Sequence, residues 1–237
     1  NSNKVAIAYA KPRQYSTQVN SDMAYRESTD LGVTWGPIVN VSNYATGALE
    51  RAYTDCDAMY TADGCLHIAW NAPVFDSVAG TISTQAAKLR HWDNCAQCMS
   101  LAFDANNFDP QATASSPQGV WNRNVCKMNL SQCTVGANKL LYLTYTYFKS
   151  DSTLHDNSAA GWKNGDIFAQ VSSTNGVTWG APTNLTNTTT NGCAAGACSS
   201  EHWSSSAMYV TDSLRIQYVK DLDAGGIVQT EGSWQDN

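Results

Sequence analysis

Hydrophobic residues along the chain gather in short runs, and four of these runs share one pattern, mostly apolar and rising towards Tyr or Trp. They are KVAIAYA from Lys4, CLHIAWNA from Cys65, KLLYLTYTYF from Lys139 and SLRIQYV from Ser213. Nearly continuous apolar runs of this length, rich in aromatic and β-branched residues, are typical of strands covered on both faces. The pattern therefore predicts one buried strand in each of four units.

Each of these runs has neighbours that also read as strands. A further strand and a tight turn precede three of them, and the turns are Ala62-Asp63-Gly64, Val135-Gly136-Ala137-Asn138 and Thr211-Asp212. Such residues tolerate positive φ or bond their own backbone, as hairpin turns require. A third strand follows each run: DMAYRES, AKLRHWD, DIFAQVS and GIVQTEG. Short outer strands, PIVNVS and APTNLT, follow in the first and third units.

Four antiparallel strands that recur along a chain are the plan of a β-propeller, whose blades are arranged radially. The order of elements therefore predicts an all-β protein with four blades, at approximately 1–44, 45–108, 109–190 and 191–237. A flat sandwich of short strands is the alternative. We favour the propeller because the units repeat in register.

Nearly the same nine letters occur twice, STDLGVTWG at 28–36 and SSTNGVTWG at 172–180, with an offset of 144 residues. Both copies lie between a predicted third strand and an outer strand. The string resembles the Asp box, or BNR repeat, of the sialidase superfamily. The matching residues are Ser28, Asp30, Gly32, Thr34 and Trp35 in the first copy and Ser172, Thr174, Gly176, Thr178 and Trp179 in the second.

The resemblance implies a propeller in which this motif is a turn at the periphery of a blade, away from the central site. In such a turn Asp30 would accept backbone N–H bonds, and Gly32 would take a conformation that a Cβ strains. Trp35 would pack on the apolar layer of the blade. Thr174 replaces the acidic residue in the second copy and offers a single hydroxyl. The motif thus predicts architecture rather than chemistry.

The first unit opens on its second strand, and the last ends before a fourth strand. Pairing the two ends cannot complete one blade, so we expect an ordered part of a longer protein. The resemblance implies about six blades in the whole propeller, within the range that this architecture allows. The chain would then cover roughly four of them.

Eight cysteines form four couples that are close in sequence: Cys56 with Cys65, Cys95 with Cys98, Cys126 with Cys133, and Cys193 with Cys198. An even number at short separations favours disulfides in an oxidising compartment, hence a secreted or cell-surface protein, although the connectivity stays open. A zinc site is the weaker alternative. Cys95 and Cys98 form the only CxxC pair, and His91 alone stands near it.

Charge and hydropathy exclude several classes of partner. The net charge is −6, the pI is near 5.0, and the 14 Lys and Arg residues are scattered. This distribution argues against nucleic acid and against an anionic membrane surface. No apolar run of about 18 residues occurs, so no membrane span is predicted. The chain starts at Asn1 without an apolar leader, and we expect that any secretion signal has been removed or was never part of this sequence.

The resemblance also implies a catalytic set at the propeller centre: three Arg that hold a carboxylate, a Tyr nucleophile activated by a Glu, and an Asp acid/base. No Arg of this chain lies in the Phe/Tyr-Arg-Ile-Pro stretch that carries the first of these Arg in the family. Arg51, beside Glu50, is a candidate ligand-binding residue, with an ordinary ion pair as the alternative. Glu201, His202 and Trp203 enter an inner strand together and could line a ligand pocket or pack as an aromatic edge.

The leading hypothesis is an extracellular, sialidase-like propeller that acts as a binding or structural module, with a glycan or a protein as partner. The alternative is a fragment of an exo-acting glycoside hydrolase whose other catalytic residues lie outside residues 1–237. A third is a cell-surface or filament component that self-associates through exposed strand edges. No metal or other cofactor is expected. The Asp221-x-Asp223-x-Gly225 string resembles the start of a calcium loop but lacks the later Glu of an EF-hand, which favours a turn.

Overall fold

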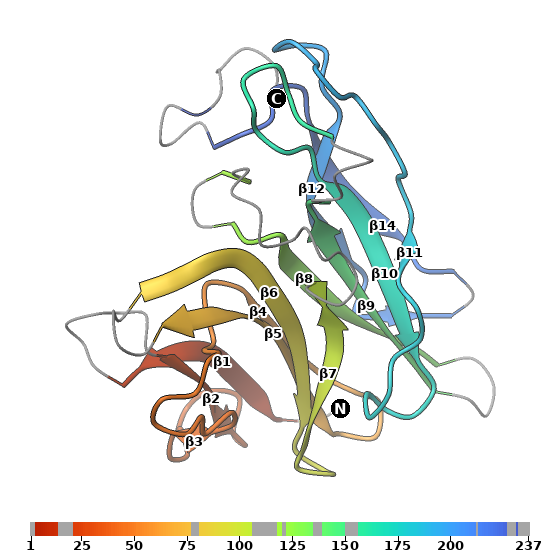
Figure 1. Ribbon diagram of the computed structural model, residues 1–237. Coiled ribbons are helices and arrows are strands. Elements are labelled where there is room, and N and C mark those ends of the chain that lie inside the picture. The colour runs from red at the N-terminus through yellow and green to blue at the C-terminus, as the bar shows by residue number, and fades with distance from the viewer. Residues whose placement is uncertain are drawn as a thin grey trace.

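The computed structural model describes residues 3–13, 21–76, 81–105, 118–119, 122–134, 139–149, 156–211, 213–226 and 231. Within these residues the protein is all-β, as expected, with fourteen strands and no helix (Figure 1). The strands are β1 (Val5–Pro12), β2 (Ser21–Ser28), β3 (Val39–Asn40), β4 (Cys56–Tyr60), β5 (Leu66–Asp76), β6 (Thr81–Asp93), β7 (Cys98–Asp104), β8 (Val125–Cys133), β9 (Leu140–Tyr147), β10 (Asp166–Ser172), β11 (Thr183–Asn184), β12 (Ser200–Ser206), β13 (Tyr209–Val210) and β14 (Ile216–Asp221).

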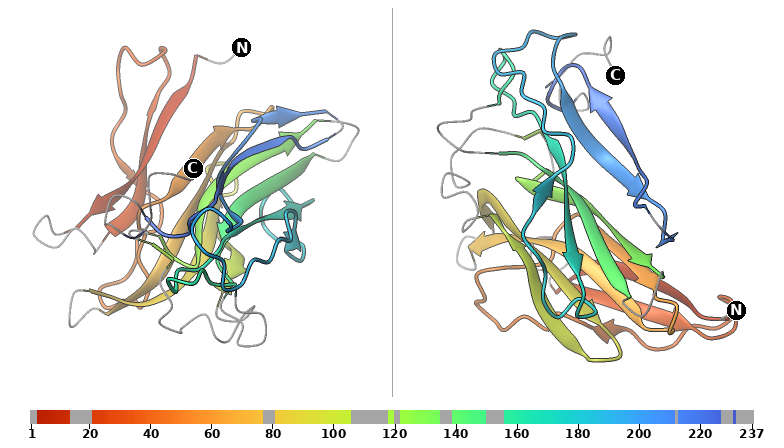
Figure 2. Two further views of the ribbon diagram at one scale, coloured as in Figure 1. Left: turned by 90° about the horizontal axis from the view of Figure 1, so that it is seen from above. Right: turned by 90° about the vertical axis from the view of Figure 1, so that its right-hand side faces the viewer.

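The strands of the described ranges form four sheets. Their orders are β1-β2-β3, β4-β5-β6-β7, β11-β10-β9-β8-β13 and β12-β14. Neighbouring strands are antiparallel except β13, which runs parallel to β8. Figures 1 and 2 show the sheets following one another in chain order, from red to blue.

Successive sheets pack on each other through apolar layers. Between the first and second sheets the layer contains Met23, Ile68 and Trp70, all fully buried, with the small residues of β1 packed against it. Between the second and third sheets it contains Phe103 and Tyr145. β5 contributes to both layers, which is why this strand is buried on both faces, whereas β9 contributes to the layer between the second and third sheets.

The fourth sheet departs from the expected hairpin before Ser213. The partner of β14 is β12, and the segment that follows β12 leaves the sheet to pair with β8. There Gln132 N donates to Met208 O at 2.8 Å, and Thr134 N donates to Val210 O at 3.1 Å. The free edge of β8 therefore supplies the backbone partners that β14, starting only at Ile216, does not offer. The expected turn at 135–138 and most of the expected strand GIVQTEG lie outside the described residues.

The two copies of the nine-letter string form the same turn, which we call the first turn (28–36) and the second turn (172–180). In each, the leading Ser Oγ accepts a bond from the Gly N–H four residues on, and the third side chain accepts one from the Thr N–H. These bonds are Gly32 N to Ser28 Oγ, Gly176 N to Ser172 Oγ, Thr34 N to Asp30 Oδ1 and Thr178 N to Thr174 Oγ1, all 2.8 Å. Both glycines have positive φ, 91° and 84°.

The third residue makes the difference between the two turns. Asp30 Oδ2 accepts a second bond from Thr34 Oγ1 at 2.6 Å, and the bonds from Thr34 and Ser28 lower the pKa of this carboxyl to about 2. Thr174 has one oxygen, which is 2.8 Å from Thr178 Oγ1 and also accepts the backbone bond. Thr174 therefore offers one acceptor atom where the first turn has two.

The repeat extends beyond the nine letters. An Asp at the start of β2 and of β10 accepts bonds from three donors, one at the end of the outer strand and two after it. Each donor and each Asp has its equivalent 144 residues away. The donors to Asp22 are Asn40 Nδ2 (2.7 Å), Ser42 Oγ (3.1 Å) and Tyr44 N (3.0 Å), and those to Asp166 are Asn184 Nδ2 (2.8 Å), Thr186 Oγ1 (3.0 Å) and Thr188 N (3.0 Å). A cation completes each set, Arg13 at 2.6 Å and Lys149 at 2.8 Å. Residues 22–44 and 166–188 are thus one structural unit used twice.

Two disulfides are present, and they correct the expected local pairing. Cys193 bonds to Cys198 as expected, but Cys65 bonds to Cys95, 30 residues away. The predicted pairs of Cys56 with Cys65, of Cys95 with Cys98 and of Cys126 with Cys133 are therefore wrong. Cys126 and Cys133 lie near opposite ends of one extended strand, β8, which holds them too far apart to bond. Antiparallel pairing places the start of β5 beside the end of β6, which brings Cys65 near the turn after Asp93. Cys56, Cys98, Cys126 and Cys133 are free thiols.

Candidate functional site

Two neighbouring strands, β8 and β12, are each interrupted by a bulge that turns a large side chain. The β8–β9 register shifts between Cys126 and Asn129, and the β12–β14 register shifts between His202 and Ser205. Within these bulges Lys127 has φ 54° and Trp203 has φ 57°. Side chains with a Cβ rarely take this conformation, which costs of order 1–3 kcal/mol at each residue. Bulges and such strain occur preferentially near functional sites.

The two strained residues meet through their side chains. Lys127 Nζ lies 4.1 Å from the centroid of the Trp203 ring, in a cation–π contact. The same nitrogen is 3.0 Å from Asp55 Oδ1, just before β4, and Lys127 N donates to Asp55 Oδ2 at 3.3 Å. Asn71 Nδ2 lies 3.4 Å from that carboxylate. Residues from three sheets are therefore joined at one point.

A second set of bonds holds the two bulges against each other. Asn129 Nδ2 donates to Ser204 O at 2.6 Å and to Ser204 Oγ at 3.1 Å. Ser204 Oγ lies 3.5 Å from Lys127 O. These contacts fix the backbone on both sides of the strained residues, so the geometry is set before any ligand arrives.

These residues surround a hollow of about 260 Å³, which we call the Trp203 hollow. It is lined by Thr54, Asp55, Cys56, Lys127, Met128, Asn129, Trp203 and Ser204. Trp203 is 54% exposed, although it lies within a strand. An exposed indole beside a carboxylate, an ammonium group and an amide offers one apolar surface and several hydrogen-bonding groups to a ligand.

The free thiol in the hollow is not a nucleophile at neutral pH. Burial, together with Asp57 and Asp55, raises the pKa of Cys56 to about 11, so the sulfur stays protonated. The thiolate is the reactive form of cysteine. The described groups of the hollow therefore favour binding over covalent chemistry.

Of the four ligand-binding candidates from the sequence, the structure places only Trp203 in the hollow. Arg51 is 2% exposed and lies over the rings of Tyr44 and Phe75, at 5.6 and 5.4 Å, so it serves packing. Glu201 is also buried and accepts a bond from Thr188 Oγ1 at 2.6 Å.

His202 completes this set, with Nε2 3.4 Å from Asp221 Oδ2. The sequence patterns did not identify Asp55 or Lys127 as candidate site residues. Lys127 stands at an ordinary polar position of an alternating strand, so the hydrophobic pattern did not mark it.

A Tyr–Glu pair of the kind that the sialidase resemblance implies does occur, between β4 and β2. Tyr60 Oη donates to Glu27 Oε2 at 2.7 Å. Burial and the bond to the carboxylate raise the pKa of Tyr60. The cation that reaches Glu27 is Lys4, at 3.4 Å.

The calcium-like string forms a turn. Asp221 Oδ1 accepts a bond from Asp223 N at 2.9 Å, and Gly225 has φ 126°. In the described part of the chain, no group of three or more His, Cys, Asp or Glu residues is placed to hold a metal ion. None of the described residues belongs to a helix that is long and apolar enough to span a membrane.

No model of a known protein family matches this chain, and no curated protein matches its sequence.

Proposed function

We propose that this protein is an extracellular, sialidase-like β-propeller module that binds carbohydrate at the Trp203 hollow. The single observation that carries the proposal is the pair of interlocked bulges that present Lys127 and Trp203 together. The positive φ angles of Lys127 and Trp203 cost free energy that ordinary strand pairing would avoid. A binding role explains why both strands keep this conformation.

The propeller assignment is supported by the sheets and the turns. Four-stranded antiparallel order in the second sheet, and β8 to β11 in the third, match the blade plan. The first turn connects β2 to β3, the last two strands of the first sheet, and the second turn connects β10 to β11, the last two of β8 to β11; the Asp-box resemblance expects the motif before an outer strand. The two disulfides favour an oxidising, extracellular location.

Sugars suit this hollow for chemical reasons. The C–H face of a hexose packs on an indole, and its hydroxyls bond to carboxylates and amides such as Asp55 and Asn129. Lys127 is already held by Asp55 at 3.0 Å, so the two charges balance. We therefore expect neutral oligosaccharides to be accepted without the burial of an unpaired charge.

The test is to titrate each member of a panel of neutral oligosaccharides into the protein and to measure binding by isothermal titration calorimetry. Trp203→Ala should weaken binding at least about tenfold, the equivalent of about 1.4 kcal/mol. Tyr218→Ala is the matched control, since Tyr218 is another exposed aromatic residue, 42% exposed on β14, and does not line the hollow. Equal affinity of the wild type and Trp203→Ala would refute the proposal, as would an absence of binding across the panel.

A further inference from the structure

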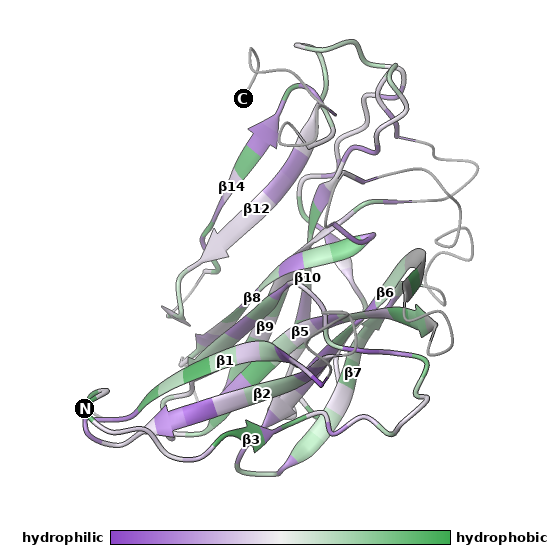
Figure 3. Cartoon of the chain, turned by 90° about the vertical axis from the view of Figure 1, so that its left-hand side faces the viewer, coloured by the Kyte–Doolittle hydropathy of each residue, from purple (hydrophilic) through white to green (hydrophobic). Residues whose placement is uncertain are grey.

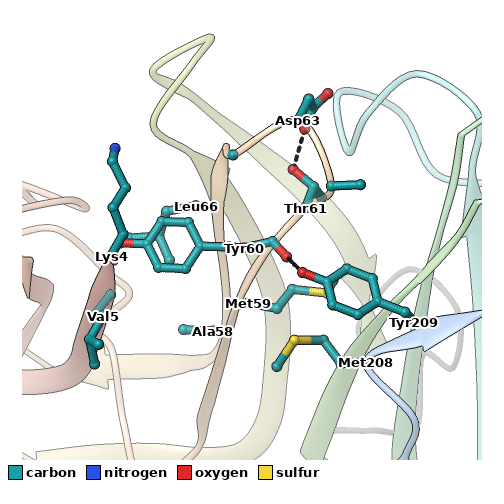
Figure 4. A pocket seen from close by; sticks show the side chains of 13 residues that line it. Lys4, Val5, Ala58, Met59, Tyr60, Thr61, Asp63, Leu66, Met208 and Tyr209 are labelled. Atoms are coloured by element: carbon teal, nitrogen blue, oxygen red, sulfur yellow. Dashed lines mark hydrogen bonds between the residues drawn. The ribbon is translucent and has the colours of Figure 1, made fainter. Parts of the chain in front are cut away.

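A second hollow of about 750 Å³ lies where β1, β4 and β13 approach one another (Figure 4). We call it the Tyr60 groove. Its walls include Lys4 and Val5 from the start of β1, Met59 and Tyr60 from β4, and Met208 and Tyr209 around β13. Figure 4 shows the Tyr60 and Tyr209 side chains on two sides of this space. Met208 and Tyr209 are about half exposed, so the groove is open to solvent.

Two sheets end at this groove. The strand order of the first sheet ends at β1 and that of the second ends at β4. A terminal strand presents backbone N–H and C=O groups that can pair with another extended chain. The backbone N–H and C=O groups that face the groove therefore determine what can pair with these strands.

The end of β4 and the turn that follows it already have side-chain partners. Tyr60 O accepts a bond from Tyr209 Oη at 2.5 Å, and Ala62 N donates to Gln132 Oε1 at 2.7 Å. These bonds occupy the backbone groups at the end of β4 that lines the groove.

The edge of β1 is different. Cys56 Sγ lies 3.7 Å from Ala8 O, so this carbonyl points away from β2 and towards β4. Backbone groups of residues two apart in a strand point to the same side, so the N–H and C=O of Ala6 also point outwards. Ala6 lines the Tyr60 groove, and β2 is the one strand that pairs with β1 in the described residues.

The same molecule already contains one addition of this kind. β13 is a two-residue extended segment that adds in parallel to the free edge of β8, and its Tyr209 reaches across to β4. The Tyr60 groove continues directly from that segment towards β1, because Met208 and Tyr209 form its wall. Val5 and Ile7, on the outer face of β1, are 36% and 52% exposed. Figure 3 shows hydrophobic stretches of β1 in green.

From these contacts we infer that the Tyr60 groove is a docking site for an extended peptide segment of a partner protein. The segment adds as a strand to β1 through the N–H and C=O of Ala6 and places an uncharged, apolar side chain between Tyr60 and Met208. Main-chain bonds give affinity in this mode, and the groove selects the side chain.

The probe is a fluorescein-labelled, end-capped hexapeptide of alternating Thr and Val, and the readout is fluorescence anisotropy. Ala6→Pro removes the N–H that the added strand would use, and Pro is tolerated where this group faces away from the sheet. We expect at least tenfold weaker binding by Ala6→Pro. The matched control is Ala10→Pro, which makes the same change on the same edge outside the groove and should bind nearly as the wild type does.

A second measurement is independent of the folding of any variant. The same peptide with N-methyl groups on alternate residues, in both registers, cannot form the full set of edge bonds and should bind the wild type at least tenfold more weakly. Equal binding by the wild type and Ala6→Pro, or by both peptides, would overturn the inference. So would concentration-dependent dimerisation that Ala6→Pro abolishes, since the edge would then belong to a second copy of the chain.

Discussion

The pair of buried histidines between the second and third sheets should make the protein sensitive to mild acid. His67 and His91 are fully buried, and His67 Nδ1 lies 2.9 Å from His91 Nε2, so one proton is shared between neutral rings. Trp179 of the second turn lies 5.4 Å from the His91 ring. Burial lowers the pKa of both histidines, and for His91, where the neighbouring His67 adds to the effect, to about 3.

The size of the effect follows from linkage. The unfolded chain binds a proton at His91 near pH 6.5, whereas the folded protein does not until about pH 3. The stabilising contribution of the neutral ring is therefore complete above pH 6.5 and is lost as the pH falls. Well below pH 6.5 each pH unit costs about 1.4 kcal/mol. Because the unfolded ring is only half protonated at pH 6.5, the loss between pH 6.5 and 4.5 is roughly 2.3 kcal/mol for His91 alone.

Urea unfolding followed by Trp fluorescence at pH 6.5, 5.5 and 4.5 measures this loss. His91→Gln removes one of the two protonation sites, so its free energy of unfolding should fall less steeply than that of the wild type, by about one proton per molecule. Carboxyl groups whose folded pKa is lowered, such as Asp22 and Asp30, lose their contribution only below their unfolded value of 3.8, outside this range. Parallel pH dependences for the two proteins would refute the reasoning.

Three further predictions concern the turns and the thiols. Gly32→Ala should lower the free energy of unfolding by about 1 kcal/mol, because of its positive φ alone. Gly176→Ala should lower it by about 2 kcal/mol or more, because a Cβ there would lie 2.0 Å from His91 Cε1. Equal losses of stability in thermal unfolding would argue against the packing of the second turn on His91. Thr174→Asp should give the second turn the two-oxygen acceptor of the first and raise the free energy of unfolding by about 0.5–1 kcal/mol, measured in urea, and a loss of stability would contradict the equivalence of the two turns. Intact mass without reductant should be four hydrogens below the free-thiol mass, and a difference of eight would contradict the four free thiols.

Much of the fold could be predicted because its signals are local. The apolar runs at β1, β5 and β9, together with the two nine-letter strings, are written in consecutive residues. The equivalence of Asp22 and Asp166 could also have been found at the same 144-residue offset, since Asn40 and Asn184 recur with it.

The rest depends on contacts between distant segments. The bond of Cys65 to Cys95 follows from the pairing of β5 with β6, and short sequence spacing pointed instead to the nearer cysteines. The strain of Lys127 and Trp203 arises from register shifts in two different sheets, which no periodic pattern encodes. The candidate site was therefore foreseen at one residue, Trp203, and missed at Asp55 and Lys127.

The most direct test of the proposed function is the indole N–H spectrum of the ¹⁵N-labelled protein during titration with a neutral oligosaccharide. The chain has eight Trp residues, so the binding position can be read from the resonance that moves. The Trp203 resonance is assigned from its loss in the spectrum of Trp203→Phe. This resonance should shift first and furthest, because the Trp203 ring forms a wall of the hollow. Saturable binding that leaves Trp203 unmoved while another indole shifts would contradict the account.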